Sequence, residues 1–324
     1  MVKAIHFKTP GGPEVLEMTD IDLAAPAAGE ITVRHTAIGL NFIDTYHRTG
    51  LYPLPLPAGI GMEGAGVVEA VGSAVSDLKV GDRVAYASPP PGSYAEARNI
   101  AADRVVKIPD GVEDQTAAAM MLKGMTAQYL VRQIYKVGKG DTILIHAAAG
   151  GVGQIVCQWA NHLGATVIGT VGSKEKAEIA KANGCHHPVL YNDEDFVERV
   201  KEITDGKMLP VVYDSIGATT FDKSLDCLRP RGLMVSFGQA AGPIPPVNLG
   251  VFAQKGSLFF TRPTLFNYIS TAADLRATAG DLFEAVSSGA VKIHIDQTFP
   301  LAEARAAHEA LEARKTTGST ILIP

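Results

Sequence analysis

Hydrophobic and polar positions alternate in short segments over roughly the first 120 residues. In EITVRHTAIGLN (30–41), Ile31 and Val33 lie on one face, the period-two pattern typical of a half-buried strand. YPLPLPAG (52–59) contains three prolines, which a central strand or a helix interior does not accommodate, so it is predicted to be a loop. Two further short apolar strands, punctuated by glycine, are predicted at 64–72 and 79–87. This part of the chain is therefore predicted to be β-rich.

From about residue 140 the pattern changes to strands that alternate with amphipathic helices. The apolar segment DTILIHAAA (141–149) enters a glycine-rich turn, and the apolar positions from Val152 to Leu163 then recur at helical spacing. The later predicted strands are 165–171, 187–191, 209–217 and 232–238, and the later helices are 174–184, 193–204 and 219–228. Strands separated by helices of this length predict parallel βαβ units with right-handed crossovers.

The last 60 or so residues do not extend this alternation. An amphipathic helix is predicted around 275–286, with Thr271 and Asp274 as its capping box, followed by a strand at 295–299, a helix at 301–313 and a strand at 319–324. We expect these elements to return to the first domain. The predicted organisation is a first domain of residues 1–125 and 264–324, with residues 126–263 inserted as a second domain.

Charge and composition exclude several classes of protein. Of 324 residues, 46% are hydrophobic and 19% charged, so the chain is expected to fold rather than remain disordered. The net charge of −5 argues against binding nucleic acid through a basic surface. Lys3, His6 and Lys8 interrupt the N-terminal segment, so no signal peptide is expected.

Two further features favour a cytoplasmic protein without a membrane segment. The three cysteines, Cys157, Cys185 and Cys227, include no closely spaced metal-ligand pair, and their odd number suits a reducing compartment. Asp, Glu, Lys and Arg are absent from 142–173, but His146 and several amides interrupt that segment. A buried strand–helix–strand unit explains it better than a membrane span.

The candidate chemistry centres on the glycine-rich turn Ala147-Ala-Ala-Gly150-Gly151-Val152-Gly153. It follows a predicted strand and precedes a predicted helix, where free N–H groups and the helix dipole favour a pyrophosphate. The alternative is a tight turn that serves only close packing of helix and strand. His146, just before the turn, is expected to be a hydrogen-bonded strand-end histidine rather than a proton shuttle.

The end of the next strand indicates which dinucleotide is bound. An NAD site usually places a carboxylate there, on the ribose hydroxyls. Here the chain reads Gly172-Ser173-Lys174-Glu175-Lys176, whose hydroxyl and ammonium groups suit a 2′-phosphate. NADPH is therefore favoured over NADH. The alternative is a solvated helix start whose lysines are balanced by Glu175 and Glu178.

Taken together, these segments resemble the medium-chain dehydrogenase/reductase superfamily, and more closely its NADPH:quinone oxidoreductase (zeta-crystallin-like) branch. The resemblance spans essentially the whole chain. It rests on PGGPEVLE (10–17), AIGLNFIDTYHRTGLYP (37–53), GMEGAGVVEAVG (61–72), GDRVAY (81–86), LKGMTAQYL (122–130), HAAAGGVG (146–153), VVYDSIG (211–217), RPRGLMVSFG (229–238) and GSLFFTRP (256–263). It implies an α/β protein with a GroES-like β-barrel domain and a Rossmann doubly wound domain, with NADPH in the cleft between them.

The positions that hold catalytic zinc in the superfamily's alcohol dehydrogenases read Asn41 and Met62 here. Neither an amide nor a thioether is a good zinc ligand, so no metal is expected. The resemblance then implies a zinc-independent quinone reductase, with direct hydride transfer from NADPH. Two alternatives stay open: an NADPH-dependent enone or alkene reductase, and a non-enzymatic NADPH-binding protein with a structural or RNA-binding role.

The resemblance also implies a set of site residues. Tyr46 and Tyr52 are the candidate substrate contacts or proton donors, with plain packing as the alternative, and Asp44 is expected to orient its neighbours. The cofactor residues are Asn41, Ile43, Tyr46, Thr126, Gly150, Gly151, Val152, Gly153, Gly172, Ser173, Lys176, Tyr191, Ser215, Ile216, Phe237, Gly238, Gln239, Phe260, Thr261 and Arg314. The family further suggests a homodimer that pairs strands near 232–261 across a two-fold axis.

Overall fold

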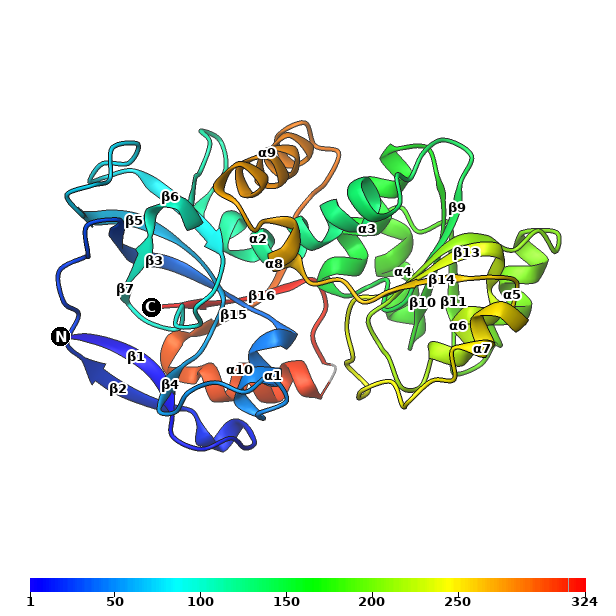
Figure 1. The fold of residues 1–324 in the computed structure, drawn as a ribbon, viewed down its shortest axis with the longest axis horizontal. Coiled ribbons are helices and arrows are strands. Elements are labelled where there is room, and N and C mark those ends of the chain that lie inside the picture. The colour runs from blue at the N-terminus through cyan, green and yellow to red at the C-terminus, as the bar shows by residue number, and fades with distance from the viewer. Residues whose placement is uncertain (314) are drawn as a thin grey trace. The chain divides into compact units, whose positions relative to one another are not determined.

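The computed structural model describes residues 1–313 and 315–324. The chain divides into two compact units (Figure 1). The first comprises residues 1–125, 269–287 and 293–324, and the second comprises residues 126–268 and 288–292.

The first unit is built on a seven-stranded, mostly antiparallel sheet. Six strands run in the order β15-β16-β3-β5-β6-β8, and β7 also pairs with β3. Their bounds are β3 (Glu30–Leu40), β5 (Glu63–Val71), β6 (Arg83–Ala87), β7 (Ala97–Ala101), β8 (Val106–Lys107), β15 (Ile295–Pro300) and β16 (Ser319–Ile323). A second sheet has the order β2-β1-β4, with β1 (Val2–Phe7), β2 (Glu17–Ile21) and β4 (Ala58–Gly59).

Helices close the first unit and connect it to the rest of the chain. They are α1 (Phe42–Arg48), α2 (Asp114–Gln128), α9 (Ala272–Ser287) and α10 (Ala304–Glu312). α10 buries Ala304, Ala307 and Leu311 in a core that also contains Ile5 and Phe7 of β1. At the start of α9, the hydroxyl of Thr271 accepts the Asp274 N–H at 3.1 Å, so the predicted N-terminal cap is present.

The second unit contains a six-stranded parallel sheet in the order β11-β10-β9-β12-β13-β14. Its strands are β9 (Thr142–Ile145), β10 (Thr166–Val171), β11 (His187–Leu190), β12 (Leu209–Asp214), β13 (Leu228–Ser236) and β14 (Phe259–Thr261). Its helices are α3 (Gly151–His162), α4 (Lys174–Ala182), α5 (Phe196–Ile203), α6 (Phe221–Asp226), α7 (Gly250–Gln254) and α8 (Leu265–Tyr268). Counted from β9, the strand order is 3-2-1-4-5-6, which defines the Rossmann fold.

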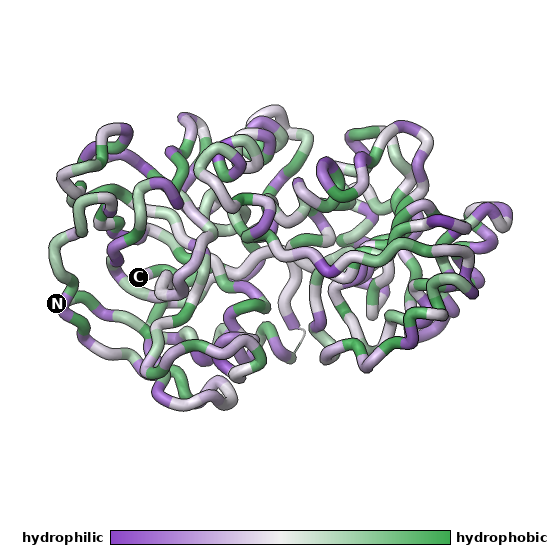
Figure 2. The backbone as a smooth tube through the Cα atoms, viewed as in Figure 1, coloured by the Kyte–Doolittle hydropathy of each residue, from purple (hydrophilic) through white to green (hydrophobic). Residues whose placement is uncertain are grey.

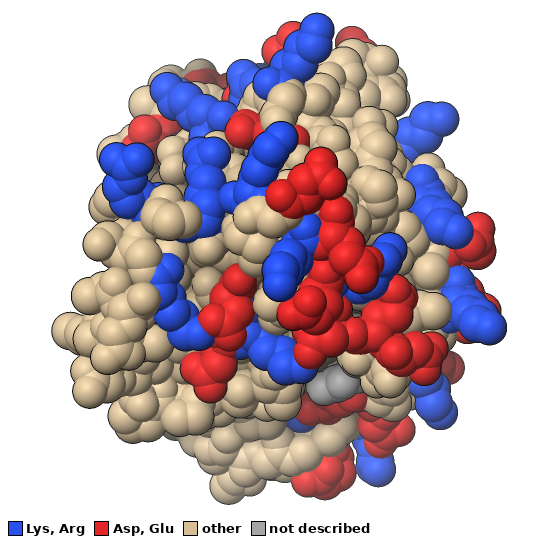
Figure 3. Space-filling model, turned by 90° about the vertical axis from the view of Figure 1, so that its right-hand side faces the viewer, with Lys and Arg blue, Asp and Glu red and all other residues tan. Residues whose placement is uncertain are grey.

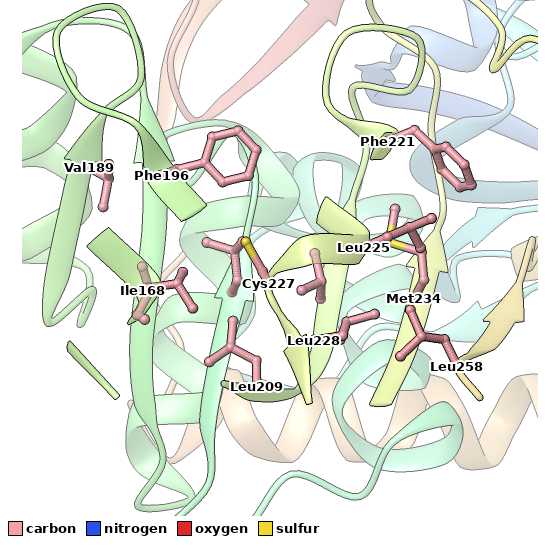
Figure 4. Close-up of a cluster of buried hydrophobic side chains, with 13 residues drawn as sticks. Ile168, Val189, Phe196, Leu209, Phe221, Leu225, Cys227, Leu228, Met234 and Leu258 are labelled. Carbon is pink, nitrogen blue, oxygen red and sulfur yellow. The ribbon is translucent and has the colours of Figure 1, made fainter. Parts of the chain in front are cut away.

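Apolar strands of the second unit carry its core, as the green segments of Figure 2 show. Ile168, Leu209 and Met234 come from three strands and are fully buried. Phe196 of α5 and Leu225 of α6 pack onto the same cluster, which Figure 4 shows from close by. Burial on both faces explains why these strands are continuous apolar segments rather than alternating ones.

One helix begins later than its pattern predicts. The expected helix 193–204 starts only at Phe196, because the Asp195 carboxylate accepts the Val197 N–H at 2.9 Å and caps the helix there. The preceding residues form a turn instead, in which Glu194 accepts the Leu190 N–H.

Candidate functional site

The glycine-rich turn lies between β9 and α3, at the carboxyl end of the first strand of the parallel sheet. Gly150 is the N-cap of α3, and its helix has neither a side-chain cap nor an acidic residue in its first turn. Gly151 and Val152 are the first two residues of α3. The free N–H groups at the start of α3 therefore have no acidic side chain of the first turn beside them. This arrangement favours the binding of a phosphate.

Gly153 is required by close packing. A Cβ atom there would lie 2.2 Å from the carbonyl oxygen of Ala147, a distance that no side chain tolerates. Ala147 itself has a positive φ of 55° and accepts the Gly150 N–H at 2.9 Å. The turn is thus folded back tightly on the helix start, as backbone recognition of a pyrophosphate demands.

The end of β10 brings Gly172, Ser173 and Tyr191 together. A Cβ at Gly172 would lie 2.7 Å from the hydroxyl of Tyr191, which is 46% exposed. Ser173 is the N-cap of α4, and its Oγ accepts the Lys176 N–H at 3.3 Å. A hydrogen bond from the same hydroxyl holds the pKa of the exposed Glu175 carboxyl below its ordinary value. Ser173 thus serves the start of α4.

The other predicted cofactor residues of the second unit follow or end neighbouring strands. Ser215 and Ile216 follow β12, and a Cβ at Gly238 would lie 2.7 Å from the Ser215 carbonyl oxygen. The loops after β12 and β13 are therefore in contact. The remaining members are Phe237 and Gln239 after β13, and Phe260 and Thr261 within β14. Since carboxyl ends of parallel strands share one edge, these residues gather on the side of the glycine-rich turn.

Asp214, which sequence reasoning missed, organises this edge. Its Oδ1 accepts the N–H groups of Ile216 at 2.7 Å and Gly217 at 3.1 Å. Its Oδ2 accepts the hydroxyls of Thr220 at 2.7 Å and Ser224 at 3.1 Å. The sequence did contain a signal for this role. Asp214 ends an apolar strand directly before a turn, where aspartate side chains commonly accept backbone N–H groups.

His146 joins the turn to Asp214. Its Nδ1 lies 2.8 Å from Thr170 Oγ1 and its Nε2 lies 2.9 Å from Ser224 Oγ. Burial lowers the pKa of this imidazole, with Asp214 acting in the opposite direction. The expectation of a hydrogen-bonded strand-end histidine is confirmed.

Thr126 lies in the last turns of α2 and is buried. It hydrogen-bonds Tyr129, whose pKa is raised by burial. The Tyr129 ring stacks on Tyr268 with centroids 4.5 Å apart. Arg314, also predicted to contact the cofactor, lies outside the described residues.

In the first unit, α1 carries the predicted nicotinamide-side residues. Asn41 precedes it as the N-cap, and Ile43 and Tyr46 lie within it. Tyr52 lies beyond its end and packs edge-on against Tyr46, with ring centroids 5.3 Å apart. The structure therefore brings both candidate catalytic tyrosines together.

Two buried carboxylates hold Asn41. Its Nδ2 donates to Glu63 Oε2 at 2.7 Å, and its backbone N–H donates to Asp44 Oδ2 at 2.9 Å. Lys123 lies 3.7 Å from Glu63 and donates to the Leu40 carbonyl at 3.0 Å. Burial raises the pKa of the Glu63 carboxyl above its ordinary value, and the nearby Lys123 ammonium offsets only part of this rise. Sequence reasoning missed Glu63 and Lys123, although each is a lone charge within an apolar segment.

Asp44 begins a buried polar chain. Burial raises the pKa of its carboxyl to about 7, although hydrogen bonds from Asn41 and Tyr94 act to lower that pKa. The Tyr94 hydroxyl donates to Asp44 Oδ2 at 3.1 Å and lies 3.1 Å from Nε2 of His308. Arg48 reaches the other ring nitrogen of His308 and also pairs with Glu312 at 2.7 Å. Asp44 thus orients its neighbours, as expected.

The donor set at the superfamily's zinc positions does not suit the metal. The Asn41 amide nitrogen is committed to Glu63, and Met62 is a buried thioether. Within residues 1–313 and 315–324, no cluster of three His, Cys, Asp or Glu side chains forms a metal site. None of the helices in this same part of the chain is long and apolar enough to cross a membrane.

A Rossmann unit with this turn and a β-rich unit that carries Asn41 in place of a zinc ligand define the medium-chain dehydrogenase/reductase class. Two family models agree. Residues 27–110 match the alcohol dehydrogenase GroES-like domain, and residues 151–284 match a model described as zinc-binding dehydrogenase.

Relatives that match over their full length identify the family within this class. The chain is 56% identical to a quinone oxidoreductase of Pseudomonas aeruginosa over 100% of both chains. It is 48% identical to a 2-haloacrylate reductase of a Burkholderia species, covering 100% of this chain and 99% of that one. The structure of Escherichia coli quinone oxidoreductase complexed with NADPH is 50% identical, covers 99% of this chain and 100% of that chain, and superimposes with a TM-score of 0.98. The chain belongs to the quinone oxidoreductase family.

Proposed function

We propose that this protein is a zinc-independent NADPH:quinone reductase that transfers a hydride directly from NADPH to a quinone. The observation that carries the proposal is the likeness, with a TM-score of 0.98 at 50% identity, to a quinone oxidoreductase complexed with NADPH. The donor set at Asn41 and Met62 supports the zinc-independent part.

The second unit fits NADPH. The uncapped start of α3, at Gly150, Gly151, Val152 and Gly153, would hold the pyrophosphate through backbone N–H groups. β10 ends without a carboxylate, and Ser173 with Lys176 would hold the 2′-phosphate. Tyr191, half exposed beside Gly172, offers a face for the adenine. The residues proposed to complete the site are Asn41, Ile43, Tyr46, Thr126, Gly172, Ser215, Ile216, Phe237, Gly238, Gln239, Phe260, Thr261 and Arg314.

Bound NADPH supplies the hydride. A quinone accepts it without a Lewis acid because reduction makes the ring aromatic and spreads the negative charge over the oxygens. The protein then has to position the quinone, and a proton has to reach its oxygen to give the quinol. Tyr46 and Tyr52, in edge-on contact, are the proposed substrate contacts and proton donors.

A second candidate is reduction of an activated alkene. The 48% identity to a 2-haloacrylate reductase over the full chain favours it. The hydride donor and the cofactor site would be the same, and only the acceptor would differ.

Anaerobic oxidation of NADPH by the purified protein tests the proposal. The protein is mixed with a panel of ortho- and para-quinones, one enone and one 2-haloacrylate, and each reaction is repeated with NADH. Fast turnover of quinones with NADPH supports the proposal. Turnover of the enone or haloacrylate alone supports the second candidate, and tight NADPH binding without turnover overturns both.

We further propose that the protein is a cytoplasmic homodimer without nucleic-acid or membrane partners, built from a GroES-like domain (1–125 and 264–324) and a Rossmann domain (126–263). The net charge of −5 supports the absence of nucleic acid. On the face seen in Figure 3, acidic side chains gather at the centre and basic ones stand among and above them. Sedimentation equilibrium with and without RNA tests both the dimer and the absence of nucleic-acid binding.

A further inference from the structure

A row of buried polar side chains links the ends of three neighbouring strands in the second unit. They are Thr170 of β10, His146 directly after β9, Asp214 at the end of β12 and Ser224 of α6. None is more than 2% exposed, so their hydrogen bonds are made within the protein rather than to bulk water. The order of donors and acceptors along the row is therefore set by the side chains themselves.

The direction of donation follows from one hydroxyl. Ser224 Oγ donates its single proton to Asp214 Oδ2 at 3.1 Å, so it accepts from Nε2 of His146, 2.9 Å away. Burial lowers the pKa of this imidazole, so His146 is neutral near pH 7 and carries its one proton on Nε2. Nδ1 then accepts the hydroxyl of Thr170 at 2.8 Å. Donation runs one way, from β10 through His146 to Asp214.

The backbone holds His146 between the same two strands. Its N–H donates to the Tyr213 carbonyl of β12 at 3.0 Å, and the Ala148 N–H donates to the Thr170 carbonyl of β10 at 3.1 Å. The Phe196 ring packs edge-on against the imidazole, with ring centroids 5.1 Å apart. The imidazole is therefore fixed in place and bridges the two strands that flank β9.

Asp214 transmits this order to the turn that follows β12. Its Oδ1 accepts the N–H groups of Ile216 and Gly217, so the carboxylate fixes the backbone of this turn. Gly217 has a φ of 89°, a conformation that other residues rarely adopt. The Asp214 carbonyl also accepts the Phe237 N–H at 2.8 Å, where the loop after β13 begins. One aspartate thus orders the start of two loops.

The two loops are also hydrogen-bonded to each other. The N–H groups of Ala240 and Ala241 donate to the carbonyls of Ser215 at 3.0 Å and Ile216 at 2.9 Å, respectively. A displacement of Asp214 would therefore move both loops together. These loops carry residues of the proposed cofactor site, namely Ser215, Ile216, Phe237, Gly238 and Gln239.

The two halves of a dinucleotide meet different parts of this sheet edge. The 2′-phosphate is proposed to lie at the end of β10, beside Ser173 and Lys176, and the pyrophosphate on the turn after β9. A dinucleotide crosses a doubly wound sheet where the strand order reverses, which is here between β9 and β12. The nicotinamide half then extends over the loops after β12 and β13, away from β10.

We propose that His146 is a positioning residue for the nicotinamide half of NADPH: it orients Ser224 and Asp214, which fix the loops that receive that half. His146 does not touch the cofactor in this role. Loops that are already ordered lose less conformational freedom when the cofactor binds, so the affinity for the nicotinamide half depends on this link. The inference rests on the proposed NADPH site.

Isothermal titration calorimetry of the full chain with NADPH and with adenosine 2′,5′-bisphosphate tests the proposal. The second ligand has the adenosine half and its phosphates but no nicotinamide. In H146L, we expect NADPH to bind about tenfold more weakly or worse, and adenosine 2′,5′-bisphosphate to keep its affinity within about twofold. T204V is the matched control, because the Thr204 hydroxyl donates to the Val200 carbonyl at 2.8 Å, outside this row. It should leave both affinities unchanged.

H146Q distinguishes positioning from plain packing. Its amide nitrogen can still donate to Ser224, so the NADPH affinity should return to within about threefold of that of the unaltered protein. S224A is a second variant should H146L fail to fold, and it should show the same selective loss.

Three outcomes would overturn the proposal: equal losses for both ligands, undiminished NADPH binding by H146L and S224A, or no recovery in H146Q. The proposed function is tested separately, by NADPH binding and turnover of the unaltered protein. Absence of NADPH binding there would overturn the proposed function and this inference together, whereas the three outcomes above would leave the proposed function intact.

Discussion

Arg48 donates a hydrogen bond from Nη1 to Nδ1 of His308 at 2.9 Å, across 260 positions of sequence. Because a guanidinium only donates, Nδ1 must be an acceptor, so a neutral His308 carries its proton on Nε2. That nitrogen faces Tyr94, whose hydroxyl donates onward to Asp44. A single direction of donation therefore runs from Arg48 through His308 of α10 and Tyr94 to Asp44, so it begins and ends on α1, the helix that carries Tyr46.

His308→Ala should destabilise the protein by about 2–4 kcal/mol, because it leaves Arg48 and Tyr94 buried without a partner and opens a cavity. Urea unfolding followed by circular dichroism measures the loss. His294→Ala is the control, since His294 is exposed, and should change the free energy of unfolding by no more than about 0.5 kcal/mol. Equal effects of the two substitutions would contradict the role given to His308.

Stability should rise with pH from about 4 to 6.5. Burial lowers the pKa of His308 to about 3 and that of His35 to about 4, from 6.5. In that interval the unfolded chain binds more protons, so each histidine adds up to about 1.4 kcal/mol per pH unit to the free energy of unfolding as pH rises.

Asp44 acts in the opposite direction. Burial raises the pKa of its carboxyl from 3.8 to about 7, so its contribution is present at low pH and is lost as pH rises through 7. Tyr94, Lys123 and Glu63 are the titratable or charged groups that act on it. In Asp44→Asn, the rise between pH 4 and 6.5 should steepen and the decline near pH 7 should vanish. A stability profile parallel to that of the unaltered protein would refute this assignment.

Lys123→Met should destabilise the first unit by about 3–5 kcal/mol, because Glu63 then stays buried without its ammonium partner. Adding Glu63→Gln should restore part of the loss, because it removes the buried charge. Its single amide oxygen still accepts from one of the two donors, Asn41 Nδ2 or the Leu122 N–H, which bind separate carboxylate oxygens of Glu63. Thermal and urea unfolding of both variants measure this. Lys107→Met is the control, because Lys107 is 55% exposed in its pair with Asp82 and should cost about 1 kcal/mol at most. Failure of the double variant to recover stability would contradict the coupling.

Lys176→Ala should weaken NADPH binding about ten- to a hundredfold and leave NADH binding nearly unchanged, since only NADPH carries the 2′-phosphate. Fluorescence titration with each nucleotide gives both constants. Lys181→Ala on the same helix pairs with Glu178 on the surface and is the control. Equal losses for NADPH and NADH would place Lys176 away from the phosphate.

Local patterns predicted the second unit well. Apolar strands, helical periods and the glycine-rich turn lie within short segments, so the alternation from β9 to β13 could be predicted from the sequence. The buried hydrogen-bond network that links Asp44, Tyr94, His308 and Arg48 could not be predicted from the sequence, because its members come from α1, the loop before β7 and α10. Buried charges such as Lys123 look like surface residues until a distant partner, here Glu63, is placed beside them.

The position of β16 has a consequence for how the protein is made. This strand lies between β15 and β3, and Leu322 pairs with Ile38. On the ribosome, residues 126–268 are complete before β16 is synthesised, so the Rossmann sheet can form while the other sheet still lacks an inner strand. Until residues 319–323 emerge, the end of β3 from Ile38 to Leu40 keeps an unpaired edge, which is open to pairing with a strand of another chain.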